Sequence, residues 1–210
     1  MPDTVSFGLF IAAAVALAVT PGPGIFYVLT RSLKGGRSEG YASAFGTAVG
    51  GLFHVVAAAL GLSAILATSA VAFNIIKVLG AVYLIFLGIR TILSKDEPFE
   101  IDAAAQSQNR RVVYQGILTE MLNPKTALFF LAFIPQFVNP DGAVVMQFIL
   151  LGSISVFLNT SVDLVVATMA GPIGQQLRKR ARLRKAQRLF TGGSLITLGA
   201  YVALSGGEQQ

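Results

Sequence analysis

Two clusters of helix-breaking residues lie inside long apolar segments, about half the chain apart. The first is Thr20-Pro21-Gly22-Pro23-Gly24 and the second is Asn123-Pro124-Lys125. Proline has no backbone N–H and ends or kinks a helix, so each cluster leaves backbone groups without their helical partners. In a segment that spans a membrane, these groups cannot turn to water and must be satisfied otherwise. Freed amides can bind a carboxylate and freed carbonyls an ammonium or a hydroxyl, which suits a small zwitterion.

Polar residues close to these clusters extend the predicted binding site. We expect substrate contacts from Thr20, Pro21, Gly22, Pro23, Gly24, Asn123, Pro124, Lys125, Thr126 and Asn159. Cysteine is absent from the sequence, and no stretch resembles a phosphate-binding loop, a metal cluster or a dinucleotide-binding fingerprint. The sequence therefore predicts no catalytic residue, no metal site and no cofactor.

Four ionisable residues lie deep inside apolar segments: His54, Glu120, Lys125 and Asp163. A charged group at the centre of a membrane span costs at least ~2.5–3.5 kcal/mol, so such residues are functional candidates. Lys125 lies too deep to reach the interface. We expect it to pair with Asp163 or Glu120, or to bind a substrate carboxylate. Asp163 follows Asn159 by one helical turn, so the two residues share a helix face.

Three of these residues are candidates for proton coupling: Asp163, Glu120 and His54. Glu120 and Asp163 bring two negative charges against the one positive charge of Lys125, and a proton could neutralise the surplus. His54 is the only histidine, and a histidine side chain titrates near neutral pH. Two alternatives stay open, namely a structural ion pair for Lys125 and a hydrogen-bonded packing role for His54.

The composition is that of an integral membrane protein. Of the 210 residues, 54% are hydrophobic and 12% charged, whereas about 25% are charged in a soluble domain. The mean hydropathy is +0.69. No Asp, Glu, Lys or Arg occurs from Thr4 to Thr30 or from Gly40 to Ile76, and both runs exceed the ~20 residues that cross ~30 Å of hydrocarbon. No basic residue precedes the first run, so we interpret it as a retained helix rather than a signal peptide.

Six apolar segments predict an all-α membrane protein with six transmembrane helices. They cover about residues 4–30, 41–66, 71–93, 112–137, 144–171 and 188–205. Alternate connections are basic, and three of them hold fourteen of the sixteen Lys and Arg residues. Because short loops rich in Lys and Arg stay in the cytoplasm, both termini are expected on the extracytoplasmic side.

The hydrophilic stretch 94–111 divides the chain into halves, 1–93 and 112–210. Its acidic residues, Pro98 and polar composition predict a cytoplasmic linker. Three predicted spans lie on each side of it, and an odd number of spans makes the halves insert with opposite orientations. This geometry predicts a 3+3 inverted repeat whose helices 1 and 4 are broken at Pro21 and Pro124, near the middle of the membrane.

Small and basic residues bear on possible partners. Gly46 and Gly50 form a GxxxG motif, which predicts close helix packing within one bundle and leaves a homodimer open. The net charge of +6 does not indicate nucleic acid, because the basic residues lie in short connections between spans. The basic run of the fifth connection is expected to fix the topology and to bind anionic lipid, at about 1 kcal/mol per residue. Its members are Arg178, Lys179, Arg180, Arg182, Arg184, Lys185 and Arg188.

In four places the chain resembles the lysine exporter and homoserine/threonine exporter family (LysE/RhtB). The cluster from Thr20 to Gly24 is similar to the first-helix motif of that family, and Asn123-Pro124-Lys125 with Phe129-Phe130 is similar to the fourth. Pro135-Gln136-Phe137 closes the fourth helix in the same way. The third-helix pattern is matched by Lys77, Gly80, Ala81, Tyr83, Leu84 and Gly88. Length and predicted span number also agree, so the resemblance covers nearly the whole chain.

The resemblance implies a bacterial inner-membrane exporter of amino acids or close derivatives, driven by the proton motive force. It also implies that the proline motifs of helices 1 and 4 line the transport path, and it does not fix the substrate. A passive channel or metal-ion permease is the main alternative, although a metal path usually offers more carboxylate, histidine or sulfur ligands. A membrane-embedded enzyme and a non-transporting scaffold are further alternatives, and no GxSxG or HExxH motif is present.

Overall fold

The computed structural model describes residues 4–93, 109–179 and 181–205, and all the secondary structure in these ranges is helical. This confirms the predicted all-α class for the described part of the chain. The linker prediction falls mostly on 94–108, outside the described residues. The elements are α1 (Thr4–Val19), α2 (Pro23–Ala57), the π-helix η1 (Ala58–Leu62), α3 (Ser63–Thr68), α4 (Ala70–Leu93), α5 (Asn109–Met121), α6 (Pro124–Leu128), the π-helix η2 (Phe129–Phe133), the 3-10 helix η3 (Ile134–Phe137), α7 (Val144–Lys179) and α8 (Ala181–Ser205).

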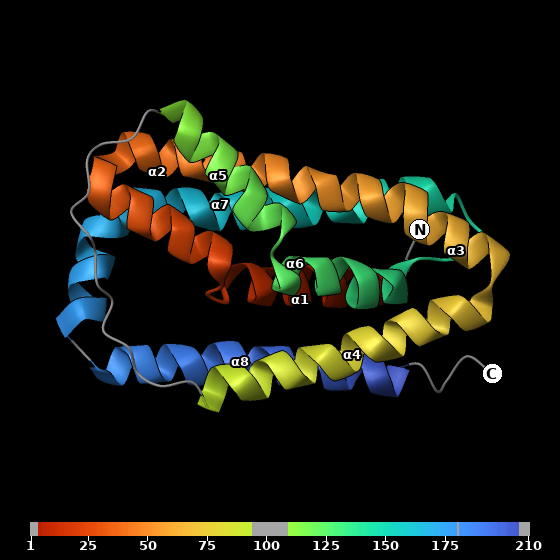
Figure 1. The fold of residues 1–210 in the computed structure, drawn as a ribbon. Coiled ribbons are helices and arrows are strands. Elements are labelled where there is room, and N and C mark those ends of the chain that lie inside the picture. The colour runs from red at the N-terminus through yellow and green to blue at the C-terminus, as the bar shows by residue number, and fades with distance from the viewer. Residues whose placement is uncertain (1–3, 94–108, 180, 206–210) are drawn as a thin grey trace.

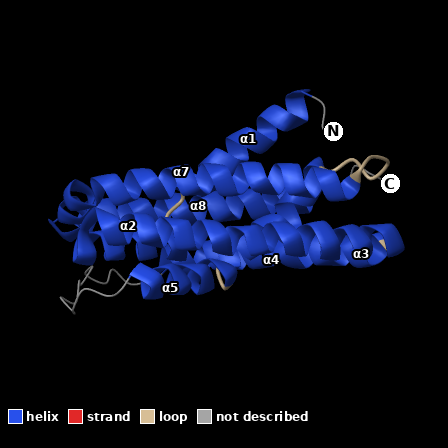
Figure 2. Cartoon of the chain, turned by 90° about the horizontal axis from the view of Figure 1, so that it is seen from above, coloured by secondary structure: helices blue, strands red, loops and turns tan. Residues whose placement is uncertain are grey.

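The helices form two packed groups with the short pieces α1 and α6 between them (Figure 1). Helix α2 packs along both α5 and α7, and α4 packs along α8. The N-terminal end of α1 runs out at an angle from the bundle (Figure 2). The main apolar core gathers around Phe10, Phe129, Phe133 and Phe148, which are fully or almost fully buried. This core therefore joins α1 to η2 and to α7.

Several helices are long and apolar and expose large apolar side chains. The helical stretches 23–65 and 144–170 are long and apolar enough to cross a membrane, and a third candidate span consists of 109–121 and 124–137, which are bent by 43°. Residues 6–19 and 81–93 form shorter apolar helices. Large apolar side chains such as Phe45 and Phe157, 62% and 71% exposed, point outward from these helices. Such an apolar exterior suits hydrocarbon rather than water.

Two helices extend beyond the predicted apolar spans. Helix α7 continues to Lys179 and α8 already begins at Ala181, whereas the spans were expected to end at 171 and to begin at 188. The segment between is rich in Gln, Arg and Lys, which favour helix, so a helix can continue past the hydrocarbon boundary. In the basic run, Arg182 and Lys185 are exposed. Arg180 and the side chains of Arg178, Lys179 and Arg184 lie outside the described residues.

Close approach of α2 and α5 depends on glycine. A Cβ atom on Gly46 would lie 2.4 Å from the carbonyl oxygen of Val113, and one on Gly50 would lie 2.7 Å from that of Ile117. Both obstacles are backbone atoms, which cannot swing away as a side chain can. The predicted packing role of the GxxxG motif within one bundle is therefore confirmed.

A sharp turn at Gly36 divides α2 into two arms that lie side by side. Gly36 has φ 72° and ψ −167°, a backbone conformation that other residues rarely adopt. The preceding residue must also be small, because a Cβ on Gly35 would lie 2.1 Å from the carboxyl carbon of Glu39. The sequence predicted a loop here, between about residues 30 and 41, whereas the helix runs up to the turn and resumes directly after it.

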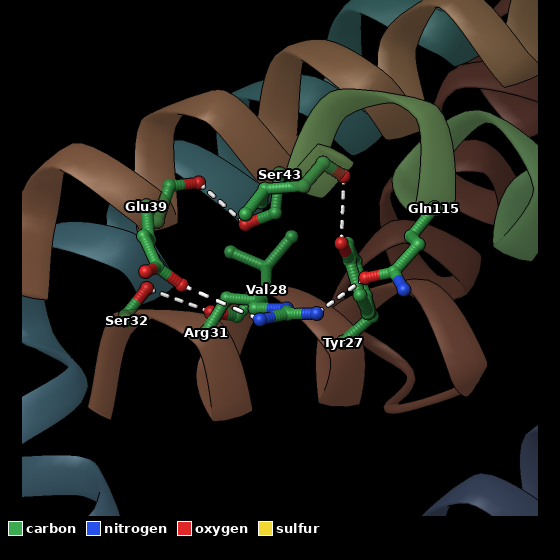
Figure 3. Close-up of polar contacts among 9 residues, drawn as sticks. Tyr27, Val28, Arg31, Ser32, Glu39, Ser43 and Gln115 are labelled. Carbon is green, nitrogen blue, oxygen red and sulfur yellow. Dashed lines mark hydrogen bonds and ion pairs between the residues drawn. The ribbon is translucent and has the colours of Figure 1, made fainter. Parts of the chain in front are cut away.

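An ion pair fastens the two arms of α2 to each other and to α5 (Figure 3). Arg31 Nη1 lies 3.5 Å from Glu39 Oε2, and Glu39 is buried. The same guanidinium group donates a hydrogen bond to Gln115 Oε1 of α5 and lies 5.6 Å from the ring centroid of Tyr27. The Tyr27 hydroxyl donates to the carbonyl of Val112, at 2.6 Å. These contacts set the position of the first arm and hence of the chain just after Pro23.

The ion pair predicts a difference between two neutralising substitutions in the same turn. Glu39→Gln should lower the free energy of unfolding by about 2–3 kcal/mol, because it leaves the partly buried Arg31 without its anionic partner. Arg37→Gln, at an exposed position, should change it by no more than about 0.5 kcal/mol. Thermal and denaturant unfolding of the purified variants in detergent measure both effects. Equal stability of the two variants would contradict this account of the turn.

Candidate functional site

Both predicted breaks are present in the structure. Helix α1 ends at Val19 and α2 begins at Pro23, while α5 ends at Met121 and α6 begins at Pro124. Each new helix starts with a proline, at the position where the missing N–H removes no helical hydrogen bond. The loss affects the helix before the break instead, because the carbonyl four residues before a proline has no helical N–H donor.

At the first break, the side chain of Lys125 supplies the donor that Pro21 lacks. In a continuous helix the N–H of residue 21 would bind the Leu17 carbonyl. Here Lys125 Nζ donates to Leu17 O at 3.1 Å and to Thr20 O at 2.8 Å. The backbone N–H of Thr20 also donates to Leu17 O, at 3.1 Å. Lys125 is only 5% exposed. An ammonium group at this end of α1 is also favoured by the negative end of the helix dipole.

The expected pairing of Lys125 with Asp163 or Glu120 was therefore wrong. No ion pair within 4.0 Å joins its ammonium group to Glu120 or Asp163. The prediction paired the charges within the second half of the chain and did not consider the carbonyls freed by Pro21. Those carbonyls lie far away in sequence, and only the fold brings α1 and α6 together.

At the second break, His54 plays the corresponding part. Pro124 lacks the N–H that would bind the carbonyl of Glu120, and His54 Nε2 donates to that oxygen at 2.9 Å. The backbone N–H of Asn123 donates to the same carbonyl at 3.1 Å. The imidazole ring also stacks on Phe130, with ring centroids 5.6 Å apart. His54 thus has the hydrogen-bonded packing environment that was left open as an alternative.

The carboxylate of Glu120 lies between the two breaks. Its Oε2 accepts a hydrogen bond from Asn123 Nδ2 at 3.0 Å, and its Oε1 accepts one from Thr126 Oγ1 at 2.6 Å. A Cβ on Gly24 would lie 2.6 Å from Oε2, so glycine at this position lets the carboxylate approach the first turn of α2. The positive end of the α2 dipole stabilises a negative charge there.

Asp163, on α7, is fully buried and accepts fewer hydrogen bonds than Glu120. Its Oδ2 accepts a hydrogen bond from Thr47 Oγ1 at 2.8 Å. Its Oδ1 has no hydrogen-bond partner within the described ranges. Asp163 faces Thr47 and not the cavity wall, whereas Asn159, one turn earlier on α7, lines the cavity described next.

A small cavity lies beside Glu120 and the two breaks. It measures about 30 Å³ and is lined by polar side chains of α2, α5, α6 and α7 and by apolar residues of α1 and η2. That volume accommodates about one or two water molecules, whereas pockets for small-molecule ligands occupy roughly 300–1,000 Å³. The structure therefore shows the site closed around its own polar groups. The polar lining consists of Thr47, Glu120, Thr126, Ser155, Asn159 and Thr160.

The fold brings most of the predicted site residues together at the breaks and around this cavity, whereas Asp163 lies behind Thr47 and does not line it. Other residues were not predicted from the sequence. Thr47 connects the cavity to Asp163. A signal for it existed, because Thr47, Gly51 and His54 recur at the spacing of one helix face. The pair Arg31 and Glu39 was also missed, although Glu39 is the only acidic residue between the first two predicted spans.

The role of His54 can be tested by a double-mutant cycle with Pro124. His54→Phe keeps the ring stacking but removes the donor to Glu120 O, and should lower the free energy of unfolding by about 1 kcal/mol. In a Pro124→Ala background the restored N–H can serve that carbonyl, so the effect of His54→Phe should shrink by about half or more. Unfolding of the four proteins in detergent measures the coupling. His54→Gln, which retains an N–H donor, is the matched control, and strict additivity of the two changes would refute the assignment.

Similarity to known proteins bears on what this site does. The chain is 31% identical, over 93% of its length and 97% of the relative, to an uncharacterised membrane protein, YrhP, of Bacillus subtilis. It is 29% identical, over 92% of its length and 94% of the relative, to the homoserine/homoserine lactone efflux proteins of Salmonella typhi and Salmonella typhimurium. No solved structure matches the chain.

The family model described as LysE type translocator matches residues 15–206. This range contains both proline breaks and all the ionisable residues around the cavity. The match confirms the resemblance drawn from the proline motifs and identifies a membrane transport protein rather than a known class of enzyme. The chain belongs to the family of LysE type translocators.

Proposed function

We propose that this chain is a secondary active exporter of small amino acids and their derivatives, driven by the proton motive force. The observation that carries the proposal is the meeting of two proline breaks, inside apolar helices, beside one small cavity lined by the buried carboxylate of Glu120. Broken helices whose backbone faces a shared cavity are the usual construction of transporter binding sites. Buried Glu120 and Lys125 lie at this meeting point and offer charges of both signs.

The proposed architecture is six membrane spans arranged as a 3+3 inverted repeat, with halves 1–93 and 112–210 and a linker 94–111. Its support is the similar construction of the two breaks. At each one a helix ends and a proline starts the next helix. A side chain distant in sequence then binds a carbonyl that lies four residues before a proline, Pro21 or Pro124. With basic connections in the cytoplasm, both termini face away from it. We place the protein in the bacterial inner membrane.

The proposed substrates are small molecules that carry a primary α-ammonium group. Homoserine and homoserine lactone appear in the names of two relatives. Both compounds carry this ammonium group, and only homoserine also has a free carboxylate. The first break offers the carbonyls of Leu17 and Thr20 to an ammonium group, with the carboxylate of Glu120 on the cavity wall. Lys125 is the cation available for a substrate carboxylate. The contacts predicted from Asn159 and Thr126 complete this site.

Transport by such a site needs a conformational change. The cavity of about 30 Å³ cannot hold even a small amino acid, so the helices around it must separate for substrate to enter and leave. In an inverted-repeat transporter, one half rocks against the other around a fixed site. The breaks are natural points of movement, because few backbone hydrogen bonds cross them.

Proton coupling is proposed to act through Asp163, with Glu120 and His54 close by. A potential of 100 mV supplies about 2.3 kcal/mol per charge, so one proton moving inward can support a roughly forty-fold gradient of a neutral zwitterion. Asp163 is connected to the cavity by Thr47, so its protonation state can influence the wall of the binding site.

Efflux from proteoliposomes tests the proposed function. Liposomes containing the purified protein are loaded with homoserine, homoserine lactone, threonine and lysine in turn, and release is followed at imposed pH gradients. We expect at least one compound to leave faster when the outside is acidic, with the acceleration removed by a protonophore. Protein-free liposomes are the control. Release of none of a wider amino acid panel at any gradient would reject the proposal.

The role of Asp163 has a matched test. Asp163→Asn should reduce gradient-driven efflux at least tenfold and flatten its pH dependence, because an amide cannot carry the proton through the cycle. Exchange of labelled for unlabelled substrate at equilibrium, which needs no net proton movement, should persist. Asp141→Asn makes the same change at an exposed position and should behave like the wild type. Full efflux by Asp163→Asn with an unchanged proton requirement would remove Asp163 from coupling.

A further inference from the structure

We propose that the ammonium group of Lys125 occupies the binding position of the substrate's own ammonium group, and that substrate binding displaces it from the carbonyls of Leu17 and Thr20. This inference rests on the proposed function, and it specifies how the site recognises its substrate. Lys125 would thus be an internal occupant that keeps the empty site closed and then becomes the partner of the substrate's carboxylate.

The first support is the fit of an alkylammonium group at the first break. Lys125 Nζ lies 2.8 Å from Thr20 O and 3.1 Å from Leu17 O, the distances of charge-assisted hydrogen bonds. Gly22 borders the lysine chain, because a Cβ there would lie 3.3 Å from Cε and 3.4 Å from Cδ and Nζ. The break therefore forms a narrow slot that holds a primary ammonium on a short apolar chain.

The second support is that this slot adjoins the cavity. Leu17, whose carbonyl accepts from Lys125, lines the cavity, as does Thr126, the residue after Lys125. Glu120, which also lines it, places a carboxylate near the same region and already binds Thr126. Once the helices have separated, a substrate ammonium in the cavity would meet acceptors whose present donor can move away on a flexible side chain.

The third support is the balance of charges. Lys125 forms no ion pair within 4.0 Å with either buried carboxylate, so its charge is stabilised directly by two carbonyls. A zwitterion can take over those carbonyls with its ammonium group and give Lys125 its own carboxylate in return. Because every buried charge keeps a partner, the exchange avoids the large penalty of an unpaired charge.

Lys125→Met tests separately the two parts of this exchange, namely the binding of the substrate ammonium to the carbonyls and the binding of the substrate carboxylate to Lys125. The uncharged thioether chain can leave the slot without giving up charge-assisted hydrogen bonds, so the substrate ammonium faces no competing cation, whereas the substrate carboxylate loses its partner. In equilibrium binding to detergent-solubilised protein, homoserine should bind at least tenfold more weakly than to the wild type. Homoserine lactone, which has no free carboxylate, should bind equally or more tightly. A lactone-to-homoserine affinity ratio within threefold of wild type would overturn the proposal, and Lys34→Met, outside the site, is the matched control.

Lys125→Ala gives a second test that does not require transport. The substitution removes the atoms of an n-propylammonium ion, so n-propylammonium chloride should raise the thermal unfolding midpoint of this variant in a saturable way. Tetramethylammonium chloride, which cannot donate hydrogen bonds, should not, and the wild type should not respond because the ammonium group of Lys125 holds its slot. Homoserine should weaken propylammonium binding to the alanine variant at least fivefold.

Two results of the second test would overturn the proposal. One is the absence of any saturable effect of propylammonium on folded Lys125→Ala. The other is saturable binding that homoserine leaves unchanged, which would make Lys125 a fixed structural cap with a separate substrate site. If propylammonium binds the alanine variant but neither homoserine nor its lactone binds the wild type, the ammonium slot stands and the proposed substrate class fails.

Discussion

The structure depends on the hydrogen bonds of two backbone carbonyls, those of Leu17 and Glu120. Each lies four residues before a proline and so loses the donor that a continuous helix would provide. A buried carbonyl without a donor costs about 1–3 kcal/mol, and a lipid environment offers no water in its place. Lys125 serves the first carbonyl and His54 the second. Each carbonyl also accepts a bond from a nearby backbone N–H, that of Thr20 or of Asn123, so the two side chains add a second donor that stabilises each break inside the bundle.

Both donors come from a different part of the chain than the carbonyl they serve. Lys125 belongs to α6, and so ties the end of α1 to the second break. His54 belongs to α2, and so ties the second break to the helix that follows the first. Each break therefore receives a donor from a helix that adjoins the other break. Glu120 and Gly24 lie close together between the two breaks. A movement at one break would therefore change the donors available at the other.

Local signals explain what the sequence could predict. Prolines inside apolar runs mark the breaks regardless of fold, and the length of the apolar runs predicts the helices, so the breaks at Pro21 and Pro124 were predicted correctly. Partners could not be predicted in the same way. The contact of Lys125 with Leu17 joins residues far apart in sequence, and the pairing of Arg31 with Glu39 exists only because Gly36 reverses the chain. Helix ends beyond the hydrocarbon boundary, as at Lys179, have no hydropathy signal at all.

The two buried carboxylates differ in a way that suits different tasks. Glu120 accepts hydrogen bonds from Asn123 and Thr126 and lies beside the positive end of α2, so its negative charge is well compensated. Asp163 accepts one from Thr47, and its second oxygen has no hydrogen-bond partner in the described part of the chain. A proton on Asp163 would remove a charge that little else stabilises, whereas a proton on Glu120 would weaken two existing bonds. This asymmetry favours Glu120 as a fixed element of the binding site and Asp163 as the group that gains and loses the proton in the proposed cycle.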